Sequence, residues 1–167
     1  MKHLKFLLLI LVFCTAASRN DITYKCMPCG ESCDKETYDH AGTCKRCDMP
    51  LVKTSDITFT SVEPNEICKY IKEHPYTVLL DVRTKEEFDG TDKLKLGTLK
   101  NAVNIPFEDL EKKLPMLDQF KHREILVYCS HSHRSPQAAY FLTQNGFEHV
   151  VNMSKGMSAL KDQSCKK

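Results

Sequence analysis

The chain has 167 residues, of which 41% are hydrophobic, and a formal net charge of +2. This composition indicates a globular protein rather than a disordered one, with enough length for one medium domain and one small domain. Lysine and arginine form no stripe interleaved with aromatic residues, so the sequence does not indicate a nucleic-acid partner.

The first segment, residues 1–18, has the pattern of a secretory signal peptide. Lysines precede an apolar run at 6–13 that is too short to span a bilayer, and small residues follow at 15–18. We therefore expect the mature chain to be exported, to the periplasm or another extracytoplasmic compartment. Cys14 leaves a lipoprotein signal as the alternative, and we expect membrane attachment only if Cys14 is lipidated.

Residues 21–53 contain five of the nine cysteines and few apolar side chains. Cys26 and Cys29 form one CxxC pair, and Cys44 and Cys47 form a second one after an interval of fourteen residues. This spacing is close to that of a four-cysteine zinc site. So short a segment buries little core and needs a metal or disulfides to fold. The pattern predicts a small metal ribbon with these four cysteines as ligands.

The same segment resembles the small heavy-metal-binding domain of bacterial exported proteins and metal-transport ATPases, through its cysteines and Met49. It departs from that family at Lys45 and Asp48, where Pro and Gly are usual. Cys33 and His40 are further candidate ligands or plain loop residues. Zinc is the default ion, and soft thiolates also admit copper or another soft heavy metal. Disulfides are the alternative, because an exported chain meets oxidants.

After a polar linker at 54–56, residues 57–162 alternate apolar strands with helices, which predicts an open parallel α/β sheet flanked by helices. We expect strands at 57–60, 77–82, 102–105, 125–128 and 149–153. We expect helices at 64–74, at 107–113, at 116–121, from 135 to 146, and in a terminal segment. A capping-box pattern at 84–87 predicts the start of a further short helix. Cys68 is expected to pack in the core, and Cys165 is expected to be an exposed thiol in a polar tail.

The strand at 125–128 leads into Cys129, a loop, and a helix for which Ser135 is the expected N-cap. Unpaired N–H groups at a helix start favour an anion, and a nearby arginine such as Arg134 favours a cysteine thiolate. A buried cysteine that only packs is the alternative. A cysteine and an arginine that bracket a loop before a capped helix point instead to a nucleophile.

This loop, Cys-x-x-x-x-Arg-Ser at 129–135, resembles the active-site loop of rhodaneses, which carry sulfur as a cysteine persulfide. The resemblance covers 57–162 and includes an Asp-Val-Arg…Glu-Phe signature at 81–88. Ser132 stands where single-domain rhodaneses usually have Gly, and Thr98 stands where they usually have His. A non-glycine residue adopts a positive φ only at a cost, so Ser132 bears on the loop geometry and the catalytic rate.

The resemblance implies a sulfurtransferase in which Cys129 takes sulfur from a small donor such as thiosulfate and passes it to cyanide or a thiol. Arg134 is expected to hold the charge of the donor, and no cofactor is needed for the transfer. The expected substrate-binding loop consists of Ser130, His131, Ser132, His133 and Ser135. Asp81 and Arg83 are expected to support the site from a strand end, through a salt bridge that fixes the loop.

Two other functions fit parts of the pattern. A phosphatase or an arsenate reductase also uses a Cys…Arg loop, but with five intervening residues and a wider cup, whereas this chain has four. The other alternative is an extracytoplasmic metal-handling protein whose rhodanese-like part is weakly active or non-catalytic.

Overall fold

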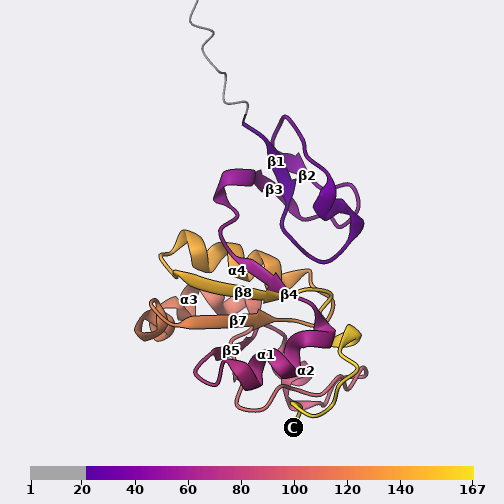
Figure 1. The fold of residues 1–167 in the computed structure, drawn as a ribbon, viewed down its shortest axis with the longest axis vertical. Helices are drawn as coiled ribbons and strands as arrows, with labels where there is room; N and C mark the ends of the chain where they lie inside the picture. Colours follow the sequence, from indigo (N-terminus) through magenta and orange to yellow (C-terminus); the bar gives the residue numbers. More distant parts are fainter. Residues whose placement is uncertain (1–21) are drawn as a thin grey trace, which may run out of the picture.

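The computed structural model describes residues 22–167, so the expected signal segment and Cys14 lie outside the described residues. A small antiparallel sheet comes first along the chain, and a five-stranded parallel sheet flanked by helices follows (Figure 1). Among the described residues, no helix is long and apolar enough to cross a membrane.

The cysteine-rich module comprises residues 22–56. Its strands are β1 (Tyr24–Cys26), β2 (Gly42–Thr43) and β3 (Pro50–Lys53), and they pair antiparallel in the order β1-β3-β2. Two 3₁₀ turns, η1 (Ser32–Lys35) and η2 (Thr54–Asp56), complete the module. Its buried side chains are mainly cysteines, with Met27, Met49 and Leu51. The module therefore has little conventional apolar core, as its composition predicts.

The parallel sheet has the strand order β4-β8-β7-β5-β6, which confirms the predicted open parallel sheet. Its strands are β4 (Thr60–Val62), β5 (Val78–Asp81), β6 (Val103–Asn104), β7 (Glu124–Tyr128) and β8 (His149–Met153). The α-helices are α1 (Ile67–Glu73), α2 (Lys85–Asp89), α3 (Leu110–Lys113) and α4 (Arg134–Gln144). The 3₁₀ segments are η3 (Pro64–Glu66), η4 (Phe107–Asp109), η5 (Leu114–Phe120) and η6 (Met157–Ala159).

Alternation along β7 divides its side chains between the two faces of the sheet. Ile125 and Val127 pack in the core that includes α3 and α4, whereas Leu126 and Tyr128 pack in the core that includes α1. Successive strand residues point to opposite faces, so a strand buried on both faces is apolar throughout. β7 lies in the middle of the sheet and delivers Cys129 to its carboxyl edge, beside the start of α4.

Several predicted element boundaries are wrong. The first strand of the parallel sheet is Thr60–Val62 rather than 57–60, because residues 54–56 still form a turn of the module. The expected terminal helix is only the short η6, followed by an extended tail. α4 begins at Arg134 with His133 as its N-cap residue, not Ser135, and Ser135 lies within the first turn.

Cys68 packs in the core as predicted, but it also forms a disulfide with Cys165, with their Cα atoms 5.2 Å apart, so the expectation of an exposed free thiol at Cys165 is wrong. The bond links α1 to the tail, and an isolated bridge between Leu99 and Lys166 holds the tail further along. The two cysteines are 97 residues apart in the sequence, and no local pattern pairs them.

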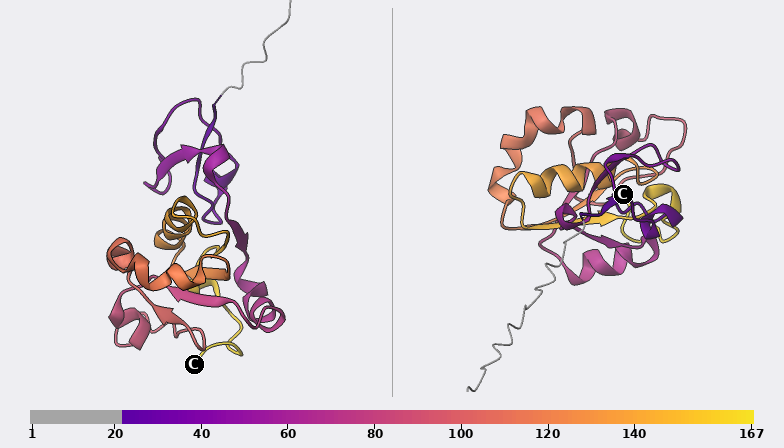
Figure 2. Two further views of the ribbon diagram at one scale, coloured as in Figure 1. Left: turned by 90° about the vertical axis from the view of Figure 1, so that its left-hand side faces the viewer. Right: turned by 90° about the horizontal axis from the view of Figure 1, so that it is seen from above.

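The module packs against the α/β domain on the side that carries α4, β4 and β8, and two further views show the same placement (Figure 2). The peptide N–H of Lys155 donates to the carbonyl of Cys29 over 3.0 Å, and the side-chain amide of Asn152 donates to the carbonyl of Pro28 over 3.0 Å. Both residues lie at the end of β8 or just beyond it. The module is therefore held next to the edge of the sheet at which Cys129 lies.

Candidate active site and thiol cluster

Cys129 is buried, with 1% of its surface exposed. Its thiol donates to the hydroxyl of Ser135 over 3.4 Å. The carbonyl groups of Cys129 and Ser130 turn away from the loop and accept the peptide N–H groups of Met157 and Ser158, both over 2.9 Å. This backbone pairing fixes the start of the loop against the segment that follows β8.

The peptide N–H groups of residues 130–133 have no hydrogen-bond acceptor within the part of the chain that the structure describes. They precede the N-terminus of α4, an eleven-residue helix, where further N–H groups point out of the helix. Unpaired donors of this kind can bind an anionic atom of a ligand. The structure thus places Cys129 beside a run of free N–H groups at the start of α4.

Gly156 makes the close contact with the loop possible. It has a φ of +68°, and a Cβ atom at this position would lie 2.5 Å from the carbonyl carbon and oxygen of Ser130. No side chain fits at such a distance, so only glycine permits this approach.

Ser132 has a φ of +56°, the left-handed region that glycine adopts without steric cost. It is also buried, and its hydroxyl has no hydrogen-bond partner among the described residues. The loop thus keeps a glycine-like backbone although it contains a serine. The turn at Ser132 also lets helical geometry begin at His133, which explains the early start of α4.

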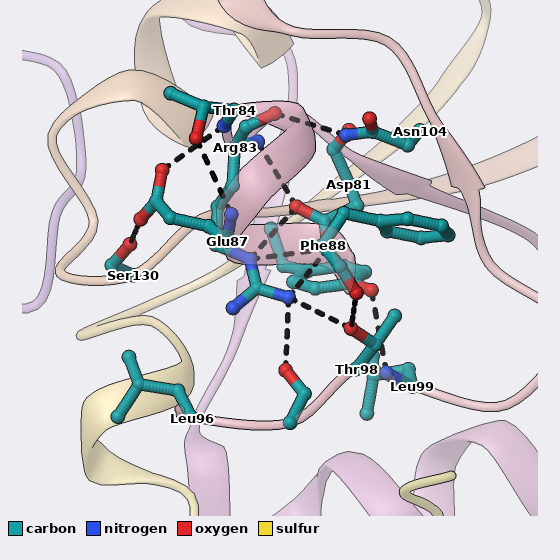
Figure 3. A network of polar contacts seen from close by, with 12 residues as sticks. Asp81, Arg83, Thr84, Glu87, Phe88, Leu96, Thr98, Leu99, Asn104 and Ser130 are labelled. Atoms are coloured by element: carbon teal, nitrogen blue, oxygen red, sulfur yellow. Dashed lines mark hydrogen bonds and ion pairs between the residues drawn. The ribbon is translucent and has the colours of Figure 1, made fainter. Parts of the chain in front are cut away.

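Arg134 forms a bidentate ion pair with Glu87, with distances of 2.7 Å from Nη1 to Oε2 and 2.9 Å from Nη2 to Oε1. Arg134 Nη2 also donates to the hydroxyl of Ser130 over 3.0 Å. That hydroxyl in turn donates to Glu87 (Figure 3). Burial alone would raise the pKa of Glu87, but hydrogen bonds from Arg134 and Ser130 lower this pKa to about 2. Arg134 therefore stands beside Cys129 with its charge balanced by a carboxylate.

Sequence reasoning missed the role of Glu87 in the site. The capping box predicted at the start of the second helix is confirmed, with Glu87 N–H donating to Thr84 Oγ1 over 3.3 Å and Thr84 N–H donating to Glu87 Oε2 over 3.0 Å. The same carboxylate also reaches Ser130 and Arg134 in the loop. Its place in the Asp-Val-Arg…Glu-Phe signature is the one signal that pointed toward the site.

Asp81 and Arg83 form a fully buried pair at the end of β5, in the network that Figure 3 shows. Arg83 Nη2 lies 2.7 Å from Asp81 Oδ2 and also donates to the carbonyl of Gly97 over 2.9 Å. Thr98, at the position of the usual histidine, accepts from Arg83 over 3.2 Å and donates to the carbonyl of Phe88 over 2.7 Å. The pair ties β5 and α2 to the 97–98 loop, as a supporting salt bridge should.

The two loop histidines are both exposed and face different surroundings. His133 Nε2 lies 3.1 Å from the carbonyl oxygen of Cys47, so it contacts the cysteine-rich module. His131 has no such contact within the described residues. Cys129, Arg134 and Ser135 come together as predicted, while His133 meets the module.

In the module, the side chains of Cys26, Cys29, Cys33 and Cys47 have their ligand atoms within 4.8 Å of one another. This cluster of thiols can hold a metal ion. Three of its members belong to the predicted ligand set. Cys44, the fourth predicted ligand, is also buried, and its thiol is a neighbour of the Cys26 and Cys47 thiols, although it is not one of the four grouped atoms. Cys33, a further candidate ligand, is the fourth member of the group.

His40, the other additional candidate in the module, points elsewhere. It is exposed and pairs with Asp39 at its Nδ1. It is not one of the grouped ligand atoms.

Residues 63–163 match the family model described as the rhodanese-like domain, and the chain belongs to this family. Among solved structures, a rhodanese-like domain protein from Staphylococcus aureus is 26% identical, with a TM-score of 0.53, and the match covers 65% of this chain and 97% of that one. A rhodanese-related protein from Thermoplasma volcanium is 27% identical, with a TM-score of 0.51, over 64% of this chain and 94% of that one.

Curated relatives include proteins named tRNA uridine(34) hydroxylase. The one from Cytophaga hutchinsonii is 34% identical over 99 residues, which is 58% of this chain and 30% of that protein. The one from Yersinia enterocolitica is 26% identical over 109 residues, which is 58% of this chain and 29% of that protein. The chain thus spans less than a third of the length of these relatives.

Proposed function

We propose that this protein is a sulfurtransferase that carries a sulfane sulfur as a persulfide on Cys129. The observation that carries this proposal is the loop itself: unpaired N–H groups of residues 130–133 beside a buried cysteine, with four residues between Cys129 and Arg134. A cup of this size suits one anionic sulfur atom. A wider five-residue loop would suit the tetrahedral oxyanion of a phosphatase or an arsenate reductase.

The reaction proceeds in two steps at the same sulfur. The Cys129 thiolate attacks the outer sulfur of thiosulfate, an S–S bond forms on Cys129, and the bond to the sulfonate breaks so that sulfite leaves. A thiol or cyanide acceptor then attacks the outer sulfur of the persulfide and regenerates the thiolate. Covalent catalysis of this kind divides one difficult transfer into two easier ones.

The loop stabilises the charge in both steps. Backbone N–H groups and the start of α4 face the anionic sulfur, and they need no reorganisation during the reaction. Ser135 stands within hydrogen-bond reach of the sulfur of Cys129. Arg134 keeps its guanidinium at the rim through Glu87, where it can share its charge with the sulfonate of the donor.

The hydroxylation named for the curated relatives is not part of this proposal. The chain corresponds to less than a third of those proteins, and its sequence lacks the basic stripe expected of a protein that binds RNA.

The test is a mass measurement on the mature protein and on Cys129→Ser after incubation with thiosulfate. The wild-type protein should gain the mass of one sulfur, and cyanide should remove it. The variant should gain none, because a hydroxyl is not ionised near neutral pH as a thiol can be. Equal adducts on both proteins would assign the nucleophile elsewhere.

We also propose that the thiol cluster holds zinc, with copper(I) or another soft metal as the alternative. When bound, the ion supplies folding free energy to a module with little apolar core. The donor set fits such an ion, because four thiols converge and three of them are buried. The sulfur transfer itself needs no metal.

Export to an extracytoplasmic compartment remains our proposal for the location of the protein, with membrane attachment only if Cys14 is lipidated. The Cys68–Cys165 disulfide supports it, since stable disulfides are rare in reducing compartments. Sequencing the N-terminus of the native protein tests both forms. An intact residue 1 on protein from the cytoplasm would contradict the proposal.

A further inference from the structure

We propose that a metal ion bound by Cys26, Cys29, Cys33 and Cys47 latches the cysteine-rich module over the Cys129 loop, so that metal occupancy controls access to Cys129. The latch concerns the same thiol as the proposed sulfur transfer and rests on that function for its purpose. It follows from three observations: the spacing of the thiols, the contacts made by two of the ligand residues, and the segment that joins those contacts to Cys129.

The four thiols have the spacing of a tetrahedral site. Sulfur atoms about 2.3 Å from a central zinc ion lie about 3.8 Å from one another. The sulfur atoms of Cys29 and Cys33 are 3.9 Å apart, and those of Cys26 and Cys47 are 3.2 Å apart. The whole group needs only small shifts to surround an ion.

Cys44 has a different part in the module. Its N–H donates to the carbonyl of Met49, and its carbonyl accepts the N–H of Asp48, both over 2.9 Å. These bonds close the turn that carries Cys47. The thiol of Cys44 is a neighbour of the Cys26 and Cys47 thiols. Cys33 on η1, rather than Cys44, completes the group of sulfur atoms that lie within 4.8 Å of one another, and we therefore take Cys33 as the fourth ligand.

Asp34, beside Cys33, fixes the first turn of the site. Its carboxylate accepts the N–H groups of Cys29 and Gly30, at 3.1 Å and 2.7 Å. The Asp34 side chain on η1 thus holds the backbone of the Cys26–Cys29 turn, and the sulfur atoms of Cys29 and Cys33 lie close together, so the position of Cys33 next to Cys29 is built into the fold.

Two of the four ligand residues also contact the α/β domain through their carbonyl groups. The carbonyl of Cys29 accepts the N–H of Lys155 over 3.0 Å, and the carbonyl of Cys47 lies 3.1 Å from His133 Nε2. An ion that fixes the sulfur atoms of Cys29 and Cys47 also fixes the direction of their carbonyl groups. Metal binding and docking of the module therefore share the same residues.

The docked segment is continuous with the backbone that holds Cys129. Lys155 receives the module on one side, and the adjacent Gly156 packs against the carbonyl of Ser130 on the other. Met157, the next residue, donates to the carbonyl of Cys129 over 2.9 Å. Residues 155–157 thus connect the Cys26–Cys29 turn of the module to Cys129, which is 1% exposed in this docked arrangement.

The latch predicts that metal release exposes Cys129. Zinc-loaded protein and protein stripped with a chelator are treated with iodoacetamide, and peptide mass spectrometry follows the alkylation of Cys129 separately from the other cysteines. We expect roughly a tenfold or larger increase in the Cys129 rate after stripping, because the docked state must open before the reagent enters. A thermal melt of the α/β domain that stays the same separates opening of the module from unfolding.

His133→Ala tests the contact without touching a thiol, and His149→Ala is the control, because His149 is an exposed histidine at the start of β8, at the edge of the sheet opposite to Cys129. His133→Ala should keep the metal and still raise the rate of Cys129 alkylation, whereas His149→Ala should behave as wild type. Equal Cys129 rates in loaded and stripped protein would overturn the latch. Because this experiment measures alkylation, equal rates would overturn the latch without contradicting persulfide formation on Cys129.

Cys33→Ser and Cys44→Ser decide the ligand set. Elemental analysis should find about one zinc ion per chain in Cys44→Ser and in wild type, and a loss of zinc in Cys33→Ser. The reverse pattern would overturn the assignment of Cys33. If the wild-type chain carried no metal, and the cluster cysteines stayed unreactive until reduced, disulfides would replace the metal site altogether.

Discussion

Replacing Glu87 with glutamine removes one charge from the centre of the site and keeps the size of the side chain. The pKa of Glu87 falls from its ordinary value of 4.5 to about 2, and at about 1.4 kcal/mol for each pKa unit its ionisation stabilises the fold by about 3 kcal/mol. Arg134 is 22% exposed and Glu87 is 15% exposed, so solvent screening reduces this to about 2 kcal/mol.

The lowered pKa of Glu87 determines how the stability difference between wild type and Glu87→Gln changes with pH. A depressed carboxyl pKa stabilises the fold fully above the unfolded pKa of 4.5, and the contribution is lost as the pH falls toward 2. The stability difference between wild type and Glu87→Gln should therefore be largest at pH 7 and should shrink steadily below pH 4.5. Urea unfolding between pH 7 and pH 3 measures the difference.

Glu86→Gln is the matched control, since Glu86 is an exposed neighbour on the same helix. It should lose less than about 0.5 kcal/mol, as surface substitutions usually do. Glu87→Gln should also form the Cys129 persulfide more slowly, because Arg134 loses its bidentate partner. A difference that stayed constant with pH, or that matched the control, would refute the role of the Glu87 charge.

Four further substitutions test the backbone and the disulfide. Ser132→Gly should stabilise the protein to urea by about 1 kcal/mol, because it removes a strained φ and an unpaired buried hydroxyl, and a loss of stability would contradict that strain. Gly156→Ala should lower the unfolding free energy by more than about 2 kcal/mol and abolish persulfide formation, because its Cβ would overlap the carbonyl of Ser130. Wild-type stability of this variant would show that the segment can move aside. Cys165→Ser should lower the unfolding free energy by about 2–4 kcal/mol by opening the loop closed with Cys68, and Cys68→Ser should match it if the loss comes from the disulfide.

Much of the fold follows from patterns that act over a few residues. The apolar run of β7, the turn at Cys129 and the apolar face of α4 specify a strand, a loop and a helix in that order. Parallel strands of this kind meet at one edge, which is why the sequence indicates that Cys129 and Asp81 end close together. The capping box of Thr84 and Glu87 is equally local, and it formed as predicted.

The tertiary structure decided the pairings between distant surfaces. Glu87 meets Arg134 across 47 residues, Cys68 meets Cys165 across 97, and His133 meets the carbonyl of Cys47 across 86. The spacing of residues along the chain does not predict such contacts, because they depend on which faces the folded elements bring together. Cys33 shows the same limit at shorter range, because the CxxC spacing does not include it and the η1 turn brings its thiol into the cluster. Local patterns therefore predict the Cys129 loop, and long-range packing determines which carboxylate holds Arg134 and where the module contacts the loop.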